Sequence, residues 1–209
     1  MRYIPSPRTI GITGGIAMGK TTVSNYLESR HGLTVLDADL YARDAVVPGT
    51  QAIAAMVHRY GPTILLPDGT LDRAALGTKI FTDPAERRWV EAHIHPFVRR
   101  TLIQNRDRAL RAFPDRPVVL VVPLLFEAEM TDLVTETWVI YCSRDRQLQR
   151  LMTRSNLSES QALARISSQL DIQIKCSKAT WVLDNSTQMA DLYAQIDRAI
   201  SRPREMGER

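Results

Sequence analysis

The chain has 209 residues, of which 44% are hydrophobic and 24% charged, and its formal net charge is +4. These values are typical of one large globular domain with a hydrophobic core, or of one domain with insertions. No apolar run approaches the roughly 20 residues that span a bilayer, and the start, MRYIPSPRTI, lacks the apolar segment of an export signal. Two well-separated cysteines, Cys142 and Cys176, are typical of reduced thiols, so we expect a cytoplasmic protein.

Arginine supplies most of the basic charge, with 23 arginines against 4 lysines. A guanidinium group binds phosphate oxygens through paired hydrogen bonds, so this excess suits a polyanionic ligand. A genome that prefers arginine to lysine gives the same count. Only 6% of the residues are aromatic, which makes a nucleic-acid-binding surface the weaker interpretation.

Five short β-like runs are predicted along the chain, at residues 7–13, 33–39, 118–125, 135–142 and 180–185. The third, VVLVVPLL, is continuously apolar, as expected of a strand buried on both faces of a parallel sheet. Helical segments alternate with these runs. The pattern predicts an α/β fold with a doubly wound parallel sheet of about five strands.

Helices are expected between the strands. The first follows at 21–30, and the absence of glycine from 78 to 206 indicates a largely helical chain between the later strands. The stretch DPAE (83–86) provides Asp83 as an N-cap and Glu86 to close a capping box. Pro96 should end or kink the helix that starts there, and a further helical stretch is expected at 144–178.

The stretch GGIAMGKTT, residues 14–22, contains the complete phosphate-loop pattern G-x-x-x-x-G-K-[ST]. Its glycines let successive backbone N–H groups point at phosphate oxygens, Lys20 reaches the β- and γ-phosphates, and the Thr21 hydroxyl ligates Mg²⁺. The pattern lies between a predicted strand and a predicted helix, which is the position that a phosphate loop occupies in known folds. It predicts a nucleoside triphosphate site with contacts from Gly15, Ile16, Ala17, Met18, Gly19, Lys20, Thr21 and Thr22.

A phosphate loop occurs in kinases, guanine-nucleotide switches and motors alike. The D-x-x-G and [NT]-K-x-D elements of a switch are absent from the sequence, which favours a small-molecule kinase. Such an enzyme needs a base or orienting group for the acceptor hydroxyl. Asp37 and Asp39 end the second predicted strand, where ligands of doubly wound sheets bind. We expect Asp39 to be that group; for both residues the alternative is capping of the next helix.

Arg146, Arg150 and Arg154 recur at every fourth residue, so one helix would present three guanidinium groups on one face. They predict a lid over the triphosphate, with a solvated helix face as the alternative. The run 118–122 does not end in aspartate, so the usual acidic metal ligand is missing there. Mg²⁺ is then expected on Thr21, ATP oxygens and waters, with Asp39 reached through water.

Seven stretches resemble the dephospho-CoA kinase family, in order and over almost the entire chain: ITGGIAMGKTTV, LDADLYARDAV, PGTQAI, RYGPTILLPDGTLDRAALGTKIF, HIHP, VVPLLFEAEM and VLDNS. The fourth stretch and PLLFE are not shared by phosphate-loop kinases at large. The resemblance implies transfer of the γ-phosphoryl group of ATP to the ribose 3′-hydroxyl of dephospho-CoA, the last step of coenzyme A synthesis, with Asp39 as the acceptor-side base.

The resemblance also implies a division of the chain. Residues 7–205 would form one kinase domain with a core at 7–49, 113–142 and 179–201, a helical acceptor-binding insertion at about 50–112 and a lid at about 143–178. Catalysis would rest on Lys20, Asp39 and Arg150, and ATP contacts would include Arg150, Arg154 and Asn185. Substrate contacts would come from Asp39, Arg43, Leu76, His95, Leu125 and Glu127. For Glu127 a helix-capping role is the equal alternative.

Two stretches depart from the usual pattern of the family. The loop commonly reads G-G-I-G-S-G-K, whereas this chain has Ala17 and Met18. Ala17 requires a negative φ or tolerated strain, and Met18 lacks a hydroxyl that could touch phosphate. Near the end, Thr180 replaces the usual aspartate and no glycine follows Ser186, which puts the adenine contacts in doubt.

The expected partner is a small molecule, without nucleic acid or membrane, and the protein is expected to be a monomer or a weak homo-oligomer. Two alternatives stay open. A nucleoside monophosphate kinase would use the arginines between 87 and 111 equally well. A nucleotide-dependent nucleic-acid binder is suggested by the isoelectric point of about 9.3.

Overall fold

The computed structural model describes residues 7–202, and these fall into two compact units. The first, which we call the core unit, comprises the chain up to Leu36 and from Ala109 onward. The second, the helical unit, is Asp37–Arg108. Of the domain expected at 7–205, residues 203–205 lie outside the described part of the chain.

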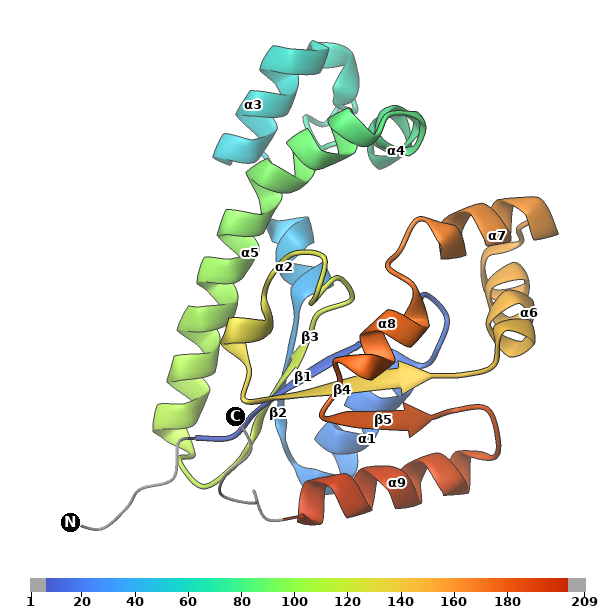
Figure 1. The fold of residues 1–209 in the computed structure, drawn as a ribbon. Coiled ribbons are helices and arrows are strands. Elements are labelled where there is room, and N and C mark those ends of the chain that lie inside the picture. Colours follow the sequence, from blue (N-terminus) through green and yellow to red (C-terminus); the bar gives the residue numbers. More distant parts are fainter. Residues whose placement is uncertain (1–6, 203–209) are drawn as a thin grey trace. The chain divides into compact units, whose positions relative to one another are not determined.

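A five-stranded sheet forms the centre of the core unit (Figure 1). Its strands lie in the order β2-β3-β1-β4-β5, with bounds β1 Thr9–Gly14, β2 Thr34–Asp37, β3 Val118–Val121, β4 Glu136–Tyr141 and β5 Trp181–Asp184. The pairs β1–β3, β1–β4 and β4–β5 are parallel. The predicted α/β fold with a parallel sheet of about five strands is confirmed.

The strand expected at 118–125 is only half as long as predicted. Its ladder ends where the Val122 N–H donates to the Ile12 carbonyl, at 2.9 Å. Pro123 has no N–H group with which to continue the ladder. The chain therefore leaves the sheet there, and the buried Leu125 lies in a turn rather than in a strand.

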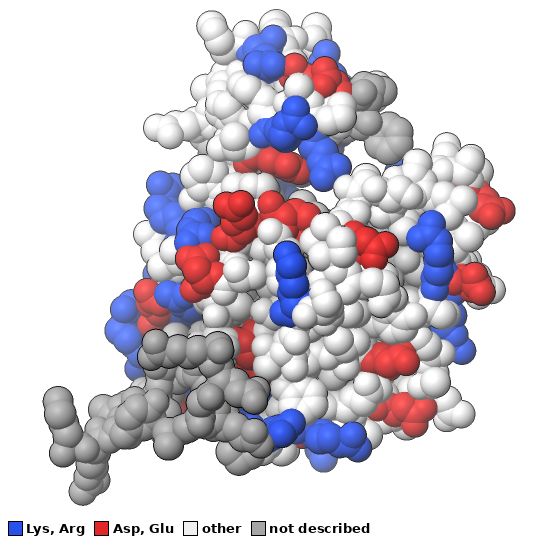
Figure 2. All heavy atoms as spheres, in the orientation of Figure 1, with Lys and Arg blue, Asp and Glu red and all other residues white. Residues whose placement is uncertain are grey.

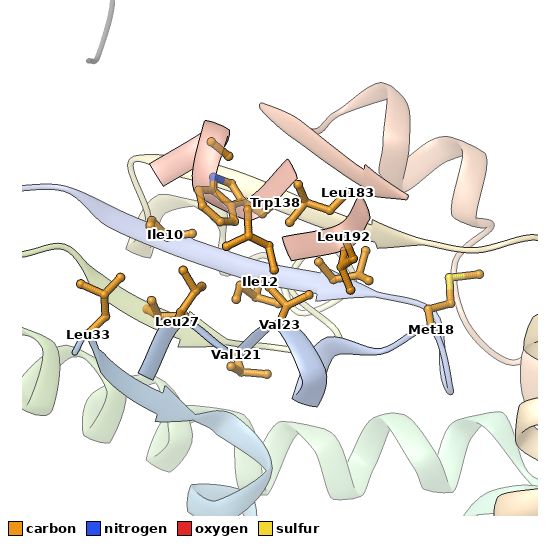
Figure 3. Packing of buried hydrophobic residues seen from close by; sticks show 14 of the residues in the cluster. Ile10, Ile12, Met18, Val23, Leu27, Leu33, Val121, Trp138, Leu183 and Leu192 are labelled. Atoms are coloured by element: carbon orange, nitrogen blue, oxygen red, sulfur yellow. The ribbon is translucent and has the colours of Figure 1, made fainter. Parts of the chain in front are cut away.

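Two helices, α1 (Lys20–His31) and α9 (Met189–Ser201), pack on one face of the sheet. The strand register places Ile12 beside Val121 and Trp138, so all three side chains point to that face. There they meet Val23 and Leu27 of α1 and, from α9, Leu192 (Figure 3). Figure 1 shows α8 (Ile172–Ser177) on the opposite side, against β4. The sheet is thus covered on both faces, as its apolar strands require.

The stretch expected to be helical at 144–178 is divided into three helices, α6 (Arg144–Ser155), α7 (Glu159–Ser167) and α8. Asn156 ends α6 in the left-handed region, with φ of 48°. Ser158 opens α7 with a capping box, and Asp171 caps α8. Asparagine tolerates the left-handed conformation that usually needs glycine, so the lack of glycine did not make this stretch continuous. A short 3₁₀ helix, η2 (Thr131–Leu133), precedes β4.

The helical unit consists of α2 (Ala38–Asp44), α3 (Gln51–Tyr60), η1 (Pro62–Ile64), α4 (Arg73–Thr82) and most of α5 (Pro84–Ala112). It has a hydrophobic cluster of its own, in which Ile53 and Met56 of α3 and Val90 of α5 are buried. An independent cluster is what lets this segment form a compact unit.

Helix α5 continues through Pro96, so of the predicted end or kink at this point the end is wrong. A proline inside a helix removes one backbone hydrogen bond and costs about 3 kcal/mol. Val90, Val98 and Leu102 are buried on either side of Pro96, and burial of such side chains is worth about 1.5–3 kcal/mol each. Packing along the helix therefore outweighs the proline.

Asp83 caps α5 as predicted, since its Oδ1 accepts the Ala85 N–H at 2.7 Å. Glu86 does not close a capping box. Its carboxylate instead accepts hydrogen bonds from Arg59 and from the Tyr60 hydroxyl, both at 2.5 Å. The Arg59 guanidinium also lies 4.5 Å from the Trp89 ring centroid. These contacts join α3 to the first turn of α5.

This arrangement predicts acid sensitivity of the helical unit. The hydrogen bonds from Arg59 and Tyr60 lower the pKa of Glu86 to about 2 from 4.5. Because the folded-state pKa is depressed, the stabilisation is present above pH 4.5 and is lost as pH falls toward about 2. We expect Glu86→Gln to lower the melting temperature at neutral pH, with a difference from wild type that shrinks across this window. A difference that is equally large at both ends would contradict the assignment.

Candidate nucleotide site

The phosphate loop, residues 14–21, connects β1 to α1 at the carboxyl edge of the sheet. Gly14 and Gly19 adopt φ of 142° and 106°, values that residues with a Cβ rarely adopt. A Cβ on Gly14 would lie 2.4 Å from the Ile140 carbonyl oxygen, and one on Gly19 would lie 2.2 Å from Asn185 Nδ2. Both glycines are therefore required by conformation and by close neighbours.

The two residues that depart from the family pattern are accommodated differently. Ala17 has φ of 60°, so the strain foreseen for this residue is present. The Met18 side chain is 1% exposed and packs at the loop end of the cluster that covers the sheet (Figure 3). Since it points into the core, methionine here fills space between the loop and the sheet and is not a phosphate ligand through its side chain.

Lys20 is the first residue of α1 and closes the loop. Its ammonium group donates to the carbonyl oxygens of Gly14 and Gly15, both at 2.9 Å. The first N–H groups of a helix have no partner within the helix, and they carry the positive end of its dipole. The loop therefore presents a lysine, a helix N-terminus and the hydroxyl of the exposed Thr21 in one place. This combination of groups is suited to an anion such as phosphate.

The segment after β5 supports the loop from the side. The Asn185 side chain is buried and donates to the Met18 carbonyl at 2.9 Å. Its Oδ1 is buried without a hydrogen-bond partner among the described residues. Arg150 of α6 donates to the Asn185 carbonyl at 3.2 Å, and Arg146 to that of Thr187 at 3.3 Å. Two of the three predicted lid arginines thus lie against this segment, whereas Arg154 is exposed.

The two other departures from the pattern have structural partners of their own. Thr180 accepts the Thr137 N–H at 3.0 Å, and Ser186 accepts the Ser143 N–H at 2.9 Å. Both hydroxyls therefore satisfy backbone groups of β4 and of the residue before α6.

Glu127 is held by a buried lysine. Lys175 has no exposed surface, and its ammonium lies 2.7 Å from Glu127 Oε1 and 3.1 Å from the Pro123 carbonyl. The Leu170 N–H also donates to Oε1, at 3.1 Å. The second oxygen, Oε2, is buried and has no partner among the described residues. Glu127 thus pairs with Lys175 instead of capping a helix, and an unsatisfied carboxylate oxygen is costly unless a ligand or water donates to it.

The remaining predicted substrate residues have different settings. Leu125 is fully buried in the core unit, next to Gly11. In the helical unit, Arg43 is exposed and Leu76 is buried. Burial lowers the pKa of His95 on α5.

Asp37 and Asp39 lie together at the start of α2. Asp37 is the N-cap, and its Oδ1 accepts the Asp39 N–H at 2.8 Å. The capping role left open for both residues therefore belongs to Asp37. The Asp39 side chain lies in the first turn of α2 and is exposed. Its role as the catalytic base stays a prediction.

Three residues near the loop were missed by the sequence analysis: Gln147, Gln169 and Lys175. Gln147 is buried four residues before the buried Leu151, so it interrupts the apolar stripe of α6. A polar residue on the apolar side of a helix is a signal that could have identified it. The sequence around Lys175 and Gln169 contains no comparable signal that would have identified them.

A strand, a glycine-rich loop and a helix N-terminus at the carboxyl edge of a parallel sheet define the class of phosphate-loop nucleotide-binding proteins. The family model for dephospho-CoA kinase matches residues 8–191. A dephospho-CoA kinase of Nostoc is 52% identical over 197 residues, covering 93% of this chain and 97% of its own length. The chain therefore belongs to the dephospho-CoA kinase family.

Solved structures agree with this assignment. A Thermus thermophilus protein with 34% identity matches with a TM-score of 0.78, covering 93% of this chain and 96% of its own. A dephospho-CoA kinase of Campylobacter jejuni, 25% identical, has a TM-score of 0.68, covering 92% of this chain and 94% of its own.

Proposed function

We propose that this protein is an ATP-dependent kinase that phosphorylates the ribose 3′-hydroxyl of dephospho-CoA, in the last step of coenzyme A synthesis. The observation that carries the proposal is a complete phosphate loop, supported by Lys20 and Asn185, in a chain that matches the family from residue 8 to residue 191.

In the proposed reaction, the 3′-oxygen of the acceptor forms a bond to the γ-phosphorus of ATP, and the bond from that phosphorus to the β–γ bridging oxygen breaks. The acceptor proton passes to Asp39. Negative charge develops on the bridging oxygen and spreads over the transferring group, where Lys20 and the N-terminus of α1 stabilise it. Arg150 adds a third positive group from α6. ADP and coenzyme A are the products.

Magnesium fits the residues of the loop. Among residues 7–202 no cluster of three histidine, cysteine or acidic side chains could enclose a metal ion. Mg²⁺ usually keeps several waters and binds through substrate phosphates and one or two protein ligands, and Thr21 supplies such a ligand. When bound, the ion would neutralise phosphate charge during transfer. Asp39, through water, is the proposed second protein group.

For the acceptor we propose the helical insertion at about 50–112, with Leu76 and His95 as contact residues, and Arg43 from the segment before it. From the core unit, Leu125 and Glu127 would contribute. The buried Oε2 of Glu127 without a partner among the described residues supports this proposal, because a hydroxyl or amide of the acceptor would satisfy it. Adenine of ATP would lie by Asn185, with Arg150 and Arg154 from the lid segment, 143–178.

A small molecule is the proposed partner, and no nucleic acid or membrane is expected. On the face in Figure 2, basic and acidic side chains of the described residues are interspersed. A nucleic-acid backbone is better matched by a continuous basic stripe. None of the described helices is long and apolar enough to cross a membrane.

We further propose that the protein is a cytoplasmic monomer or weak homo-oligomer. The described cysteines, Cys142 and Cys176, are both free thiols, as is usual for proteins of a reducing compartment.

The test is an assay with Mg·ATP and a panel of acceptors: dephospho-CoA, AMP, CMP and shikimate. We expect phosphorylation of dephospho-CoA alone. Preferred transfer to AMP or CMP would instead assign a nucleoside monophosphate kinase, and no transfer with salt-sensitive binding to DNA or RNA would favour the nucleic-acid alternative.

Arg150 provides a prediction on the lid segment. Arg150→Ala should lower kcat about 10²–10³-fold, as the loss of a preorganised charge donor does. The side chain donates to the Asn185 carbonyl at 3.2 Å and also interacts with the Cys142 thiol. We expect the loss of these contacts to change the melting temperature much less than the substitution changes kcat. Arg144→Ala, an exposed position on the same helix, is the control. A lower melting temperature with unchanged kcat would make Arg150 structural.

A further inference from the structure

The backbone of Ile16, inside the phosphate loop, is held by two glutamine side chains. Gln169 Oε1 accepts the Ile16 N–H at 2.7 Å, and Gln147 Nε2 donates to the Ile16 carbonyl at 3.0 Å. Gln147 comes from α6 and is 3% exposed. Gln169 comes from the segment between α7 and α8. One residue of the loop is thus bound on both sides by the segment that follows β4.

Ile16 and Ala17 are the central residues of a tight turn. The Met18 N–H donates to the Gly15 carbonyl at 3.3 Å and closes it. A positive φ at the third position, here 60° at Ala17, is characteristic of a type II turn. Glycine is preferred there, and most other residues favour a type I turn, in which the central peptide is flipped. The turn therefore has a conformation that alanine disfavours.

Gln147 opposes that flip directly. The carbonyl that it binds belongs to the Ile16–Ala17 peptide, which is the central peptide of the turn. In a trans peptide the N–H points away from the C=O, so fixing the carbonyl also fixes the direction of the Ala17 N–H. Gly15 makes room for this contact, because a Cβ there would lie 2.7 Å from Gln147 Nε2.

We propose that Gln147 and Gln169 are positioning residues for ATP binding: they hold the Ile16–Ala17 part of the loop in its binding shape despite the alanine at position 17. The inference rests on the proposed function only in taking ATP as the ligand of the loop. Without the two side chains the loop relaxes toward the conformation that alanine prefers, and ATP must restore the binding shape at the expense of affinity.

The experiment is a pair of double-mutant cycles read out by the dissociation constant of Mg·ATP, measured by titration calorimetry without acceptor. Gln147→Met keeps the side-chain volume but removes the donor, and Gln169→Ala removes the acceptor. In the Ala17 background Gln147→Met should weaken ATP binding about 5- to 30-fold, the factor that corresponds to left-handed backbone at a residue with a Cβ. Gln169→Ala should weaken it less, because it releases the preceding Gly15–Ile16 peptide while Gln147 still holds the central one. In an Ala17→Gly background the loss should fall below about threefold, because glycine adopts that backbone at little cost.

Gln149→Met on α6 and Gln173→Ala on α8, both at exposed positions, are the matched controls and should bind ATP as wild type does. Equal losses in both backgrounds, or none in either, would overturn the proposal. Tighter binding after Gln169→Ala would also overturn it, since Gln169 would then compete with phosphate for the Ile16 N–H. If Gln147→Met lowers the melting temperature too far for titration, Gln147→Leu, which also removes the donor, takes its place in the cycle. Failure of the acceptor assay with these cycles intact would refute the proposed function but not the positioning role.

Discussion

Replacing Asp39 by asparagine is expected to lower kcat for dephospho-CoA about 10²–10⁴-fold, the range for loss of a general base. A ribose hydroxyl keeps its proton at neutral pH, so a carboxylate within about 2.6–3.2 Å is needed to accept it as the bond to phosphorus forms. The transition state of phosphoryl transfer is loose, and part of the loss will reflect orientation of the hydroxyl. ATP affinity, measured by titration, should stay within a few-fold of wild type.

The neighbouring aspartate supplies the control. Asp37 Oδ1 caps α2 by accepting the Asp39 N–H, and asparagine retains that oxygen. Asp37→Asn should therefore preserve both the cap and most of the activity. Normal turnover by Asp39→Asn would show that Asp39 is not the base.

Lys20→Ala is expected to lower kcat by at least about a hundredfold, because the variant loses the cation that stabilises the transferring group. Lys20 also donates to the Gly14 and Gly15 carbonyls, and ATP phosphates would compete with these carbonyls for the ammonium group. A steady-state assay with saturating Mg·ATP and dephospho-CoA measures the effect. Lys178→Ala, at an exposed lysine of the core unit, should retain full activity. Near wild-type turnover by Lys20→Ala would remove this lysine from the mechanism.

The sheet was predictable because its strands are short apolar runs between clear punctuation, and each appears within a few residues of its expected place. The errors occur where one residue type overrides a pattern. Pro123 ended a strand that hydrophobicity alone would have continued, whereas Pro96 failed to end a helix that packing sustains. Asn156 interrupted a helical stretch in which only glycine was expected to do so.

The phosphate loop could be predicted because its function depends on backbone geometry that glycine spacing encodes locally. Its supports could not. Glu127 was identified, but not the buried Lys175 that holds it, because that contact joins residues far apart in the sequence. The roles of Gln147 and Gln169 depend in the same way on how α6–α8 return to the loop. Single-sequence patterns do not contain such pairings.

The distant origin of these supports has a consequence for how the protein matures. The side chains that hold Ile16 and Met18 lie 131, 153 and 167 positions further along the chain. Contacts of such long sequence separation form late, after the cost of closing the intervening chain has been met. During synthesis the loop leaves the ribosome early and stays without its supports until β5 has been added. Full affinity for nucleotide should therefore arise only after α6–α8 and Asn185 have joined the loop, and before that point nucleotide should stabilise β1 and α1 less.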